Sequence, residues 1–282
     1  VLSEDVTNPL LPKRLWGSQS LKAWGIRLGV HKEEFETDWK TYSKEMLEYC
    51  VQDVQVNLVL YLELSDSGFS QKSIDLEHEL AEVCRRIGNN GWTFDEKAAG
   101  KLYAKLSKLR GDLEDALVEL FPPWEIETEF IPKVNNKARG YVKGEPFTKV
   151  KEVVFNPNSR VHIHKCLVDK YAWKPKHWSA HGAATIDETI LSGLHYPEAK
   201  KLAEYFMIQK RIGQLAEGKA AWLKLVSPDG KLRHRIISGG TISGRASHRS
   251  PNLGQVPRAS APFGKECRDL FTAPRGWLVC GS

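Results

Sequence analysis

Apolar residues recur at intervals of three and four along several stretches of the chain, which predicts amphipathic helices. The first helix is expected at residues 21–28, with an N-cap at Ser18 and a stop at Gly29. A second is expected at residues 42–64. The positions that share one face of this second helix are Met46, Tyr49, Cys50, Asp53, Val54 and Asn57. A carboxylate therefore shares a helix face with apolar side chains.

A Ser/Gly-rich linker at residues 65–73 marks the first domain boundary. The helix that follows ends near residues 88–91. Its apolar side consists of Leu80, Val83, Cys84 and Ile87. A short extended piece, Trp92–Phe94, leads to Asp95, which is positioned to cap the next helix.

That next helix is one of two long predicted helices, because its apolar seam continues to about Phe121, where two prolines stop it. The seam steps alternately by three and four: Ala99, Leu102, Leu106, Leu109, Leu113, Ala116 and Leu120. Such spacing is typical of a helix that packs along a partner helix. The partner is a second long helix expected at residues 197–225, and the two would form an antiparallel pair.

Between the two long helices, residues 122–152 are punctuated by proline and glycine, and glutamates alternate with Ile126, Thr128 and Phe130. This alternation predicts a small β-rich insertion. A short helix should follow, capped near Asn158 or Ser159. From Gly230 onward the pattern changes to loops and short strands, and the last residues, 276–282, read as the beginning of a strand.

The composition is that of a globular protein, with 282 residues, 41% hydrophobic and 27% charged. This excludes a disordered tail, a collagen-like fibre and a disulfide-rich mini-protein, and the length favours about two domains. No apolar run approaches the roughly 20 residues of a membrane span. The five cysteines are scattered, as expected for free thiols in a reducing cytosol, and no His/Cys cluster has zinc-ligand spacing. We expect a fragment cut at both ends.

The positive charge is confined to the end of the chain. Residues 228–282 hold nine basic and three acidic residues, so the net charge of the whole chain, +6, equals that of this segment. Seven of the nine are arginines, whose planar donors suit phosphates and base edges. A nucleic acid is the simplest partner, and a solvated basic surface is the alternative. The same alternatives hold for a basic stripe on the 95–121 helix: Lys97, Lys101, Lys105 and Lys108.

The strongest motif is the run TISGRASHRSPNLGQVP, residues 241–257. Gly244 permits close approach of the backbone to a partner. Arg245, Asn252 and Gln255 can donate hydrogen bonds to the purine N3 and pyrimidine O2 acceptors of the DNA minor groove. Every Watson–Crick pair carries these acceptors, so such contacts test the geometry of a pair without reading its sequence. A template-copying enzyme needs this property.

This run resembles the Thr-x-x-Gly-Arg-x-Ser…Pro-Asn-Leu-Gln-x-Ile-Pro segment of family A DNA polymerases, the DNA polymerase I kind. FGKECRDLF, residues 263–271, is similar to their Gly-x-x-x-Arg-x-x-Phe segment. Across these motifs, the sequence is closest to the bacteriophage branch of the family. Residues 205–218 resemble the thumb helix, 91–95 the entry to the thumb, and 20–29 the attached proofreading domain. Two departures are Gly254, where the family often has Leu-Gln together, and Arg233, where it often has His.

The resemblance implies an α+β fold in three parts. Residues 1–70 would be the C-terminal part of an RNase H-like 3′–5′ exonuclease domain. Residues 74–226 would be a mainly helical thumb with the short insertion at 122–152, and residues 227–282 the beginning of the polymerase palm. The insertion lies where some phage enzymes recruit a thioredoxin clamp, but it is short for that purpose.

The resemblance also implies the roles of particular residues. EYCVQDV, residues 48–54, resembles the third exonuclease motif, so Tyr49 would orient a water and Asp53 would bind one of two catalytic Mg²⁺ ions. The other carboxylates would lie outside this chain, so the fragment alone should be inactive. Primer–template DNA would contact eight residues: Lys101, Lys105, Lys210, Thr241, Arg245, Asn252, Gln255 and Arg268. The nucleotide substrates, dNTPs, would bind only the full-length enzyme.

Three hypotheses remain at this point. The chain is a piece of a DNA-directed DNA polymerase with an associated proofreading exonuclease, a stand-alone DNA-binding module without enzymatic activity, or a relative of single-subunit RNA polymerases. The polymerase hypothesis places the protein in the cytoplasm, that of a host cell if a phage encodes it. The exonuclease-like segment argues against the RNA polymerase hypothesis.

Overall fold

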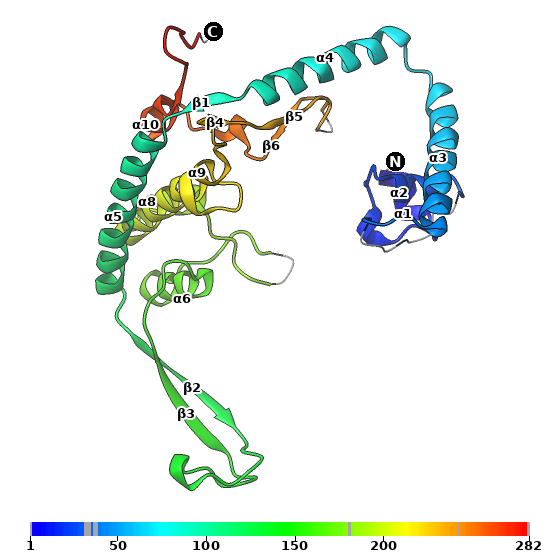
Figure 1. Cartoon of the computed structure of the whole chain (residues 1–282). Helices are drawn as coiled ribbons and strands as arrows, with labels where there is room; N and C mark the ends of the chain where they lie inside the picture. Colours follow the sequence, from blue (N-terminus) through cyan, green and yellow to red (C-terminus); the bar gives the residue numbers. More distant parts are fainter. Residues whose placement is uncertain (1, 31–34, 36–38, 180–181, 242, 281–282) are drawn as a thin grey trace. The chain divides into compact units, whose positions relative to one another are not determined.

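The computed structural model describes residues 2–30, 35, 39–179, 182–241 and 243–280. The chain forms two compact units, Val1–His78 and Glu79–Ser282. Within the described residues, long helices combine with three small antiparallel sheets, which confirms the predicted α+β class (Figure 1). The expected linker coincides with the gap between helices α3 and α4, and the division between the compact units falls eight residues later, inside α4.

The first unit contains α1 (Leu2–Thr7), a 3₁₀ turn (Lys13–Leu15), α2 (Leu21–Arg27) and α3 (Lys44–Ser65). The predicted cap at Ser18 is wrong, because Ser20 directly precedes α2 and its hydroxyl accepts a hydrogen bond from the Ala23 amide at 3.3 Å. A cap must lie next to the first helical residue to reach the free amides of the first turn. The stop at Gly29 is confirmed by its left-handed φ of 69°.

The covered stripe of α3 differs from the predicted face. Val56 is fully buried and packs near Gly25 of α2, where a Cβ would lie 3.5 Å from a Val56 methyl group. Met46, Tyr49 and Asp53 are half-buried on the same stripe, whereas three predicted members of the face are exposed: Cys50, Val54 and Asn57. The covered positions advance by three and four, so the stripe is one side chain wide, narrower than predicted.

A buried ion pair closes the first unit. The Asp5 carboxylate is 1% exposed and accepts two hydrogen bonds from the Arg27 guanidinium, at 2.8 and 2.9 Å, and one from the Gly17 amide at 2.6 Å. The Arg27 hydrogen bonds lower the pKa of Asp5 from 3.8 to about 2. The pair fastens α1 and the following turn to α2.

We expect the first unit to lose stability in acid through Asp5. Because the folded pKa is depressed, the stabilisation is fully present above the unfolded value of 3.8 and is lost as the pH falls toward about 2. Replacement by Asn should therefore destabilise the unit at pH 6 and flatten its pH dependence between 4 and 2. Urea unfolding of the parent chain and Asp5→Asn at several pH values measures this. Parallel pH curves for the two chains would contradict it.

Helix α4 (Gln71–Asn90) spans the division, and its part from Glu79 onward opens the second unit. The predicted apolar side of α4 is not a core face, because Leu80, Val83 and Ile87 are 40–48% exposed. Only Cys84 and Gly88 are buried, one turn apart. A Cβ on Gly88 would lie 2.3 Å from the His234 carbonyl oxygen, so the helix meets the rest of the unit by close backbone contact along a narrow line.

Strand β1 (Trp92–Phe94) and helix α5 (Glu96–Leu120) follow as predicted. The Asp95 carboxylate accepts a hydrogen bond from the Ala98 amide at 2.9 Å, which confirms the cap. The first half of the seam is buried, but Leu117 replaces Ala116 as the buried position near the end of the helix. The seam turns there because it meets a second core cluster, which contains Leu117 and Phe121.

The partner helix is shorter than predicted. Helix α8 (Pro197–Ile212) passes into a π-helical turn (Gly213–Glu217), and α9 (Trp222–Leu225) is separate. Gly218 ends the turn, where a Cβ would lie 2.5 Å from the Gly213 carbonyl oxygen. The predicted antiparallel pairing is confirmed by hydrogen bonds that run in opposite order along the helices: Tyr103–Glu217 at 3.1 Å, Arg110–Gln209 at 2.9 Å and Glu114–Tyr205 at 2.7 Å.

The insertion is an antiparallel hairpin of β2 (Trp124–Phe130) and β3 (Phe147–Val153), with a 3₁₀ turn (Lys137–Arg139) near its tip. Figure 1 shows it extending from the end of α5. Helix α6 (Arg160–Tyr171) is capped by Ser159, one of the two predicted caps, and α7 (Glu188–Ser192) precedes α8.

The last 55 residues of the chain contribute strands that pair with β1, near the beginning of the second unit. Strands β4 (Lys231–Leu232) and β7 (Phe271–Thr272) flank β1 in one antiparallel sheet, and β5 (Arg235–Ile237) pairs with β6 (Ser247–Arg249) in another. A 3₁₀ turn (Leu253–Gln255) and α10 (Gly264–Asp269) lie between β6 and β7. The strand expected after residue 276 is not formed within residues 277–280, where Leu278 is 92% exposed, because no neighbouring strand pairs with it.

Candidate nucleic-acid interface

Thr241 shapes the turn that carries Arg245. Its hydroxyl accepts a hydrogen bond from the Arg245 amide at 2.9 Å and donates one to the Arg245 carbonyl at 3.0 Å. Gly244 adopts a left-handed φ of 74°, which a side chain would strain. Both bonds use backbone atoms of Arg245, so its exposed guanidinium stays free to contact a partner. Thr241 thus fixes the backbone of Arg245, and its predicted contact with DNA stays a prediction.

The second turn, Asn252–Gln255, carries two amide side chains, both exposed. Gln214, in the π-helical turn after α8, donates a hydrogen bond to the Gln255 carbonyl at 3.1 Å. Gly254 permits a tight approach here, since a Cβ would lie 3.3 Å from both the His248 ring and the Asn252 side-chain oxygen. The departure noted in the sequence at Gly254 therefore makes room for His248.

Two arginines tie this surface to the helices behind it. Arg268 of α10 donates from Nε to the Pro257 carbonyl at 2.8 Å. Arg211 of α8 is 9% exposed and donates to the Pro262 carbonyl at 3.4 Å and to Gln214 Oε1 at 3.3 Å. Arg268 was predicted to contact DNA and lies beside the turn. Arg211 and Gln214 were missed, although both belong to the helix that resembles the thumb.

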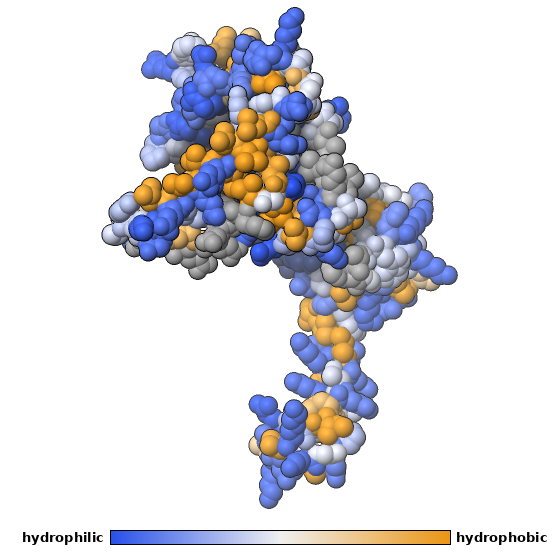
Figure 2. All heavy atoms as spheres, turned by 90° about the vertical axis from the view of Figure 1, so that its right-hand side faces the viewer, coloured by the Kyte–Doolittle hydropathy of each residue, from blue (hydrophilic) through white to orange (hydrophobic). Residues whose placement is uncertain are grey.

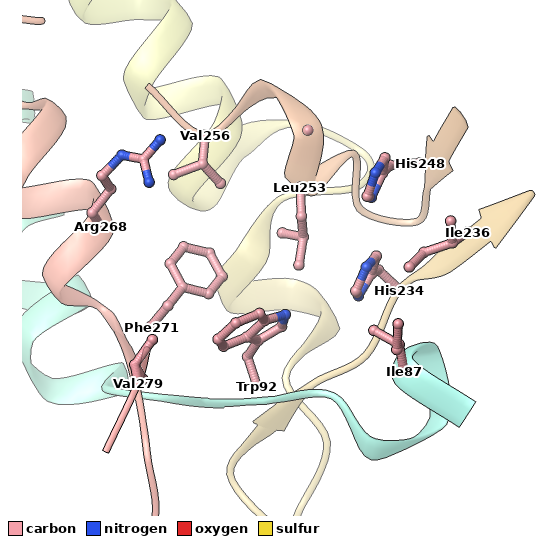
Figure 3. Close-up of a pocket in the computed structure, with 11 residues that line it drawn as sticks. Ile87, Trp92, His234, Ile236, His248, Leu253, Val256, Arg268, Phe271 and Val279 are labelled. Atoms are coloured by element: carbon pink, nitrogen blue, oxygen red, sulfur yellow. The ribbon is translucent and has the colours of Figure 1, made fainter. Parts of the chain in front are cut away.

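A cavity of about 570 Å³ lies behind the second turn (Figure 3). Its lining is mostly apolar and aromatic and includes Trp92, Leu253, Val256 and Phe271. At one end, His234 and His248 stack with their ring planes 4° apart. Burial, and secondarily the neighbouring His248, lowers the pKa of His234, which favours the neutral form of that ring. The surface turns thus rest on an apolar support.

The predicted lysines divide into two groups. Lys101 and Lys105 of α5 line a shallow cavity together with Glu266 and Asp269 of α10. Lys105 lies 3.8 Å from the Glu266 carboxylate and over the Phe263 ring, so part of its charge is already compensated. Lys210 is exposed on α8 and does not line this cavity.

Tyr49 and Asp53 lie one turn apart on α3, in the first unit, and both are half-buried. The Tyr49 ring packs against Phe35 and Trp39, with ring centroids 5.4 and 5.7 Å apart. Among the residues that the structure describes, no three His, Cys, Asp or Glu side chains converge on a possible metal position. Asp53 could supply one metal ligand, but the described residues do not complete a Mg²⁺ site.

The family model of DNA polymerase family A matches residues 133–281, which include both turns and α10. The chain belongs to this family. The DNA-directed DNA polymerases of Escherichia phage T7 and Enterobacteria phage T3 are 33% and 34% identical to it, over 93% of the chain and 49% of each relative. This family A chain therefore spans about half the length of these relatives.

Family membership agrees with two more distant similarities. DNA polymerase I of Thermus filiformis is 30% identical over 138 residues, which cover 44% of this chain and 15% of that protein. The polymerase domain of Pol1 from M. smegmatis, solved in complex with DNA primer-template and dNTP, superimposes with a TM-score of 0.61 at 17% identity, over 93% of this chain and 39% of that one. The second similarity shows a shared fold. No helix among the described residues is long and apolar enough to cross a membrane.

Proposed function

We propose that this chain is the primer–template-binding part of a DNA-directed DNA polymerase. The observation that carries the proposal is the pair of surface turns, in which exposed Arg245, Asn252 and Gln255 side chains stand on a backbone held by Thr241 and Gln214. Donors fixed in this way suit the minor-groove acceptors that every base pair shares. Phosphate contacts from the lysines would add affinity without sequence preference.

The proposal divides the chain as its sequence suggests. Residues 1–70 would belong to an exonuclease domain, 74–226 to the thumb and 227–282 to the beginning of the palm. The coverage of about half of each phage relative supports a longer parent enzyme, which would hold the dNTP site and complete the Mg²⁺ sites. Tyr49 and Asp53 would form one edge of the exonuclease site. The phage origin of these relatives favours action in the cytoplasm of a host cell.

Replacing Lys101, Lys105 and Lys210 together by Ala tests the proposal on the 282-residue chain. Each phosphate contact contributes about 0.9 to the slope of log affinity against log salt concentration. We expect the slope for duplex primer–template to become shallower by about 1.8 to 2.7, the smaller value applying if Glu266 already neutralises Lys105. Fluorescence anisotropy at several salt concentrations measures the slope.

An unchanged slope in the Lys101/Lys105/Lys210 variant would contradict the duplex position proposed here. A stand-alone DNA-binding module would show the same slope change, so polymerase activity of the full-length gene product separates these two hypotheses.

A further inference from the structure

The register of the β2–β3 hairpin separates its charges onto two faces. Residues 122–153 contain six cations and five acids, so their composition shows almost no net charge. In the hairpin, Trp124 pairs with Val153 and Phe130 with Phe147, and side chains alternate between the faces. One face carries only acidic charges, and the opposite face carries only basic ones. These are Glu125, Glu127, Glu129 and Glu152 on the first face, and Lys149 and Lys151 on the second.

The tip of the hairpin extends the lysine face. The rings of Phe130, Tyr141 and Phe147 form a cluster with centroids 4.7–5.8 Å apart, and the two phenylalanines belong to the lysine face. Tyr141 therefore folds the tip segment onto that side. The tip carries four cations and one acid: Lys133, Lys137, Arg139, Lys143 and Glu145. Together, the lysine face and the tip form what we call the basic track.

All six cations of the basic track are exposed. Among the ion pairs of the described residues, none joins one of these six cations to a carboxylate. The alternation of the strands explains this, because the four glutamates of the stem project from the other face. The base of the arm is fixed to the helices, since Trp124 packs against His162 and lies under Lys165 of α6. Figure 2 shows the arm as the narrow lower part of the molecule, with hydrophobic side chains near its base and far end.

The arm lies at the end of α5 that is remote from the candidate interface. The beginning of α5 contacts α10, where the Asp95 amide donates to the Leu270 carbonyl at 2.9 Å. The helix has 25 residues, so its other end lies about 37 Å away. This distance corresponds to about 11 base pairs of DNA, and a seven-residue strand spans about 23 Å, or about seven base pairs more.

We propose that the hairpin is a second duplex-binding element, which lays its basic track along the phosphate backbone about one helical turn from the primer end. This rests on the proposed function and adds that the duplex runs from the surface turns past Lys101 and Lys105 along α5. The acidic face would be repelled by phosphates, so it turns away from the duplex and sets the orientation of the arm. The contact is sequence-independent.

The test compares three double variants of the 282-residue chain: Lys149→Ala with Lys151→Ala, Lys137→Ala with Arg139→Ala, and the matched control Glu127→Gln with Glu129→Gln. All six positions are exposed, so the fold should persist, and circular dichroism checks this. Binding is measured on primer–templates with duplexes of about 10 and about 25 base pairs, because only the longer one reaches the arm.

On the longer duplex, each cation variant should lower the salt slope by about 1.8 and weaken binding at least about ten-fold at low salt. On the shorter duplex neither variant should change binding, and the glutamate control should bind both as tightly as the parent or more tightly. Unchanged slopes on the longer duplex, or equal losses on both, would overturn the proposal.

The same measurements separate this proposal from the one on which it rests. If the Lys101/Lys105/Lys210 variant loses affinity and the hairpin variants do not, the hairpin proposal fails and the proposed function stands. Adding Lys133→Ala to the Lys137/Arg139 variant gives a triple variant with the same charge change as the thumb variant. If neither triple variant changes the slope, the duplex position itself is wrong. A hairpin that binds thioredoxin, with DNA binding unaltered in its variants, would also overturn the hairpin proposal.

Discussion

Arg245→Ala and Gln255→Ala are each expected to slow primer extension by about 5- to 150-fold in the full-length gene product. This corresponds to the loss of about 1–3 kcal/mol for a hydrogen bond to a base edge. Both substitutions should leave the turns intact, because Thr241 and Gln214 bond to backbone atoms of these two residues. The loss would therefore report on contacts with DNA.

The informative measurement compares matched with mismatched primer ends. Because the minor-groove acceptors occur on every correct pair, the two variants should extend both kinds of end more slowly and discriminate less between them. Their sequence preference should hardly change. Arg275→Ala is the control for Arg245→Ala, since it removes an equal charge from an exposed position outside the two turns. If both variants extend matched ends at the parental rate, the minor-groove assignment is wrong.

Trp222→Ala is expected to destabilise the second unit by about 3–5 kcal/mol. Trp222 is 2% exposed and meets Phe94 and Phe271 edge-on, with ring centroids 6.4 and 5.2 Å apart. These partners belong to β1 and β7, so the indole joins α9 to the sheet that supports the candidate interface. Its removal leaves a large cavity at this junction.

The matched control for this experiment is Trp277→Ala, because Trp277 is 75% exposed and its loss should change stability by no more than about 0.5 kcal/mol. Urea unfolding followed by circular dichroism avoids a signal that depends on tryptophan itself. Equal midpoints for the two variants would show that Trp222 does not hold the sheet to the helices.

Several elements were predictable because their determinants are local. Asp95 caps α5 with the carboxylate of the residue before the helix, and the alternation after Pro123 indicates an extended hairpin. Residue types and order alone also predict Arg245, Asn252 and Gln255 as candidate minor-groove donors, and this assignment stays a prediction. The hydrogen bond that supports the second turn was not predictable in this way, since Gln214 lies 41 residues before the Gln255 carbonyl to which it donates. Such a contact leaves no periodic pattern.

Two of the errors, the apolar faces predicted for α3 and α4, share one physical origin. Apolar residues at sequence intervals of three and four show which side chains share a helix face. They do not show how much of that face a neighbouring element covers. On α4, the predicted apolar face is largely exposed because Gly88 meets the chain at His234 by backbone contact. On α3, the covered stripe is narrow, so Cys50, Val54 and Asn57 face outward.

The sequence by itself predicted most of the long helices, the caps at Asp95 and Ser159 and the residue types available in the 241–257 turns, because each depends on residues close together in the chain. The tertiary structure alone decided how the hairpin distributes its charge. Glutamates and lysines nearly balance in its sequence, and only the pairing of β2 with β3 places them on opposite faces. Register joins residues that are 17 to 29 positions apart, and a shift by one residue in the pairing would exchange the faces of one strand.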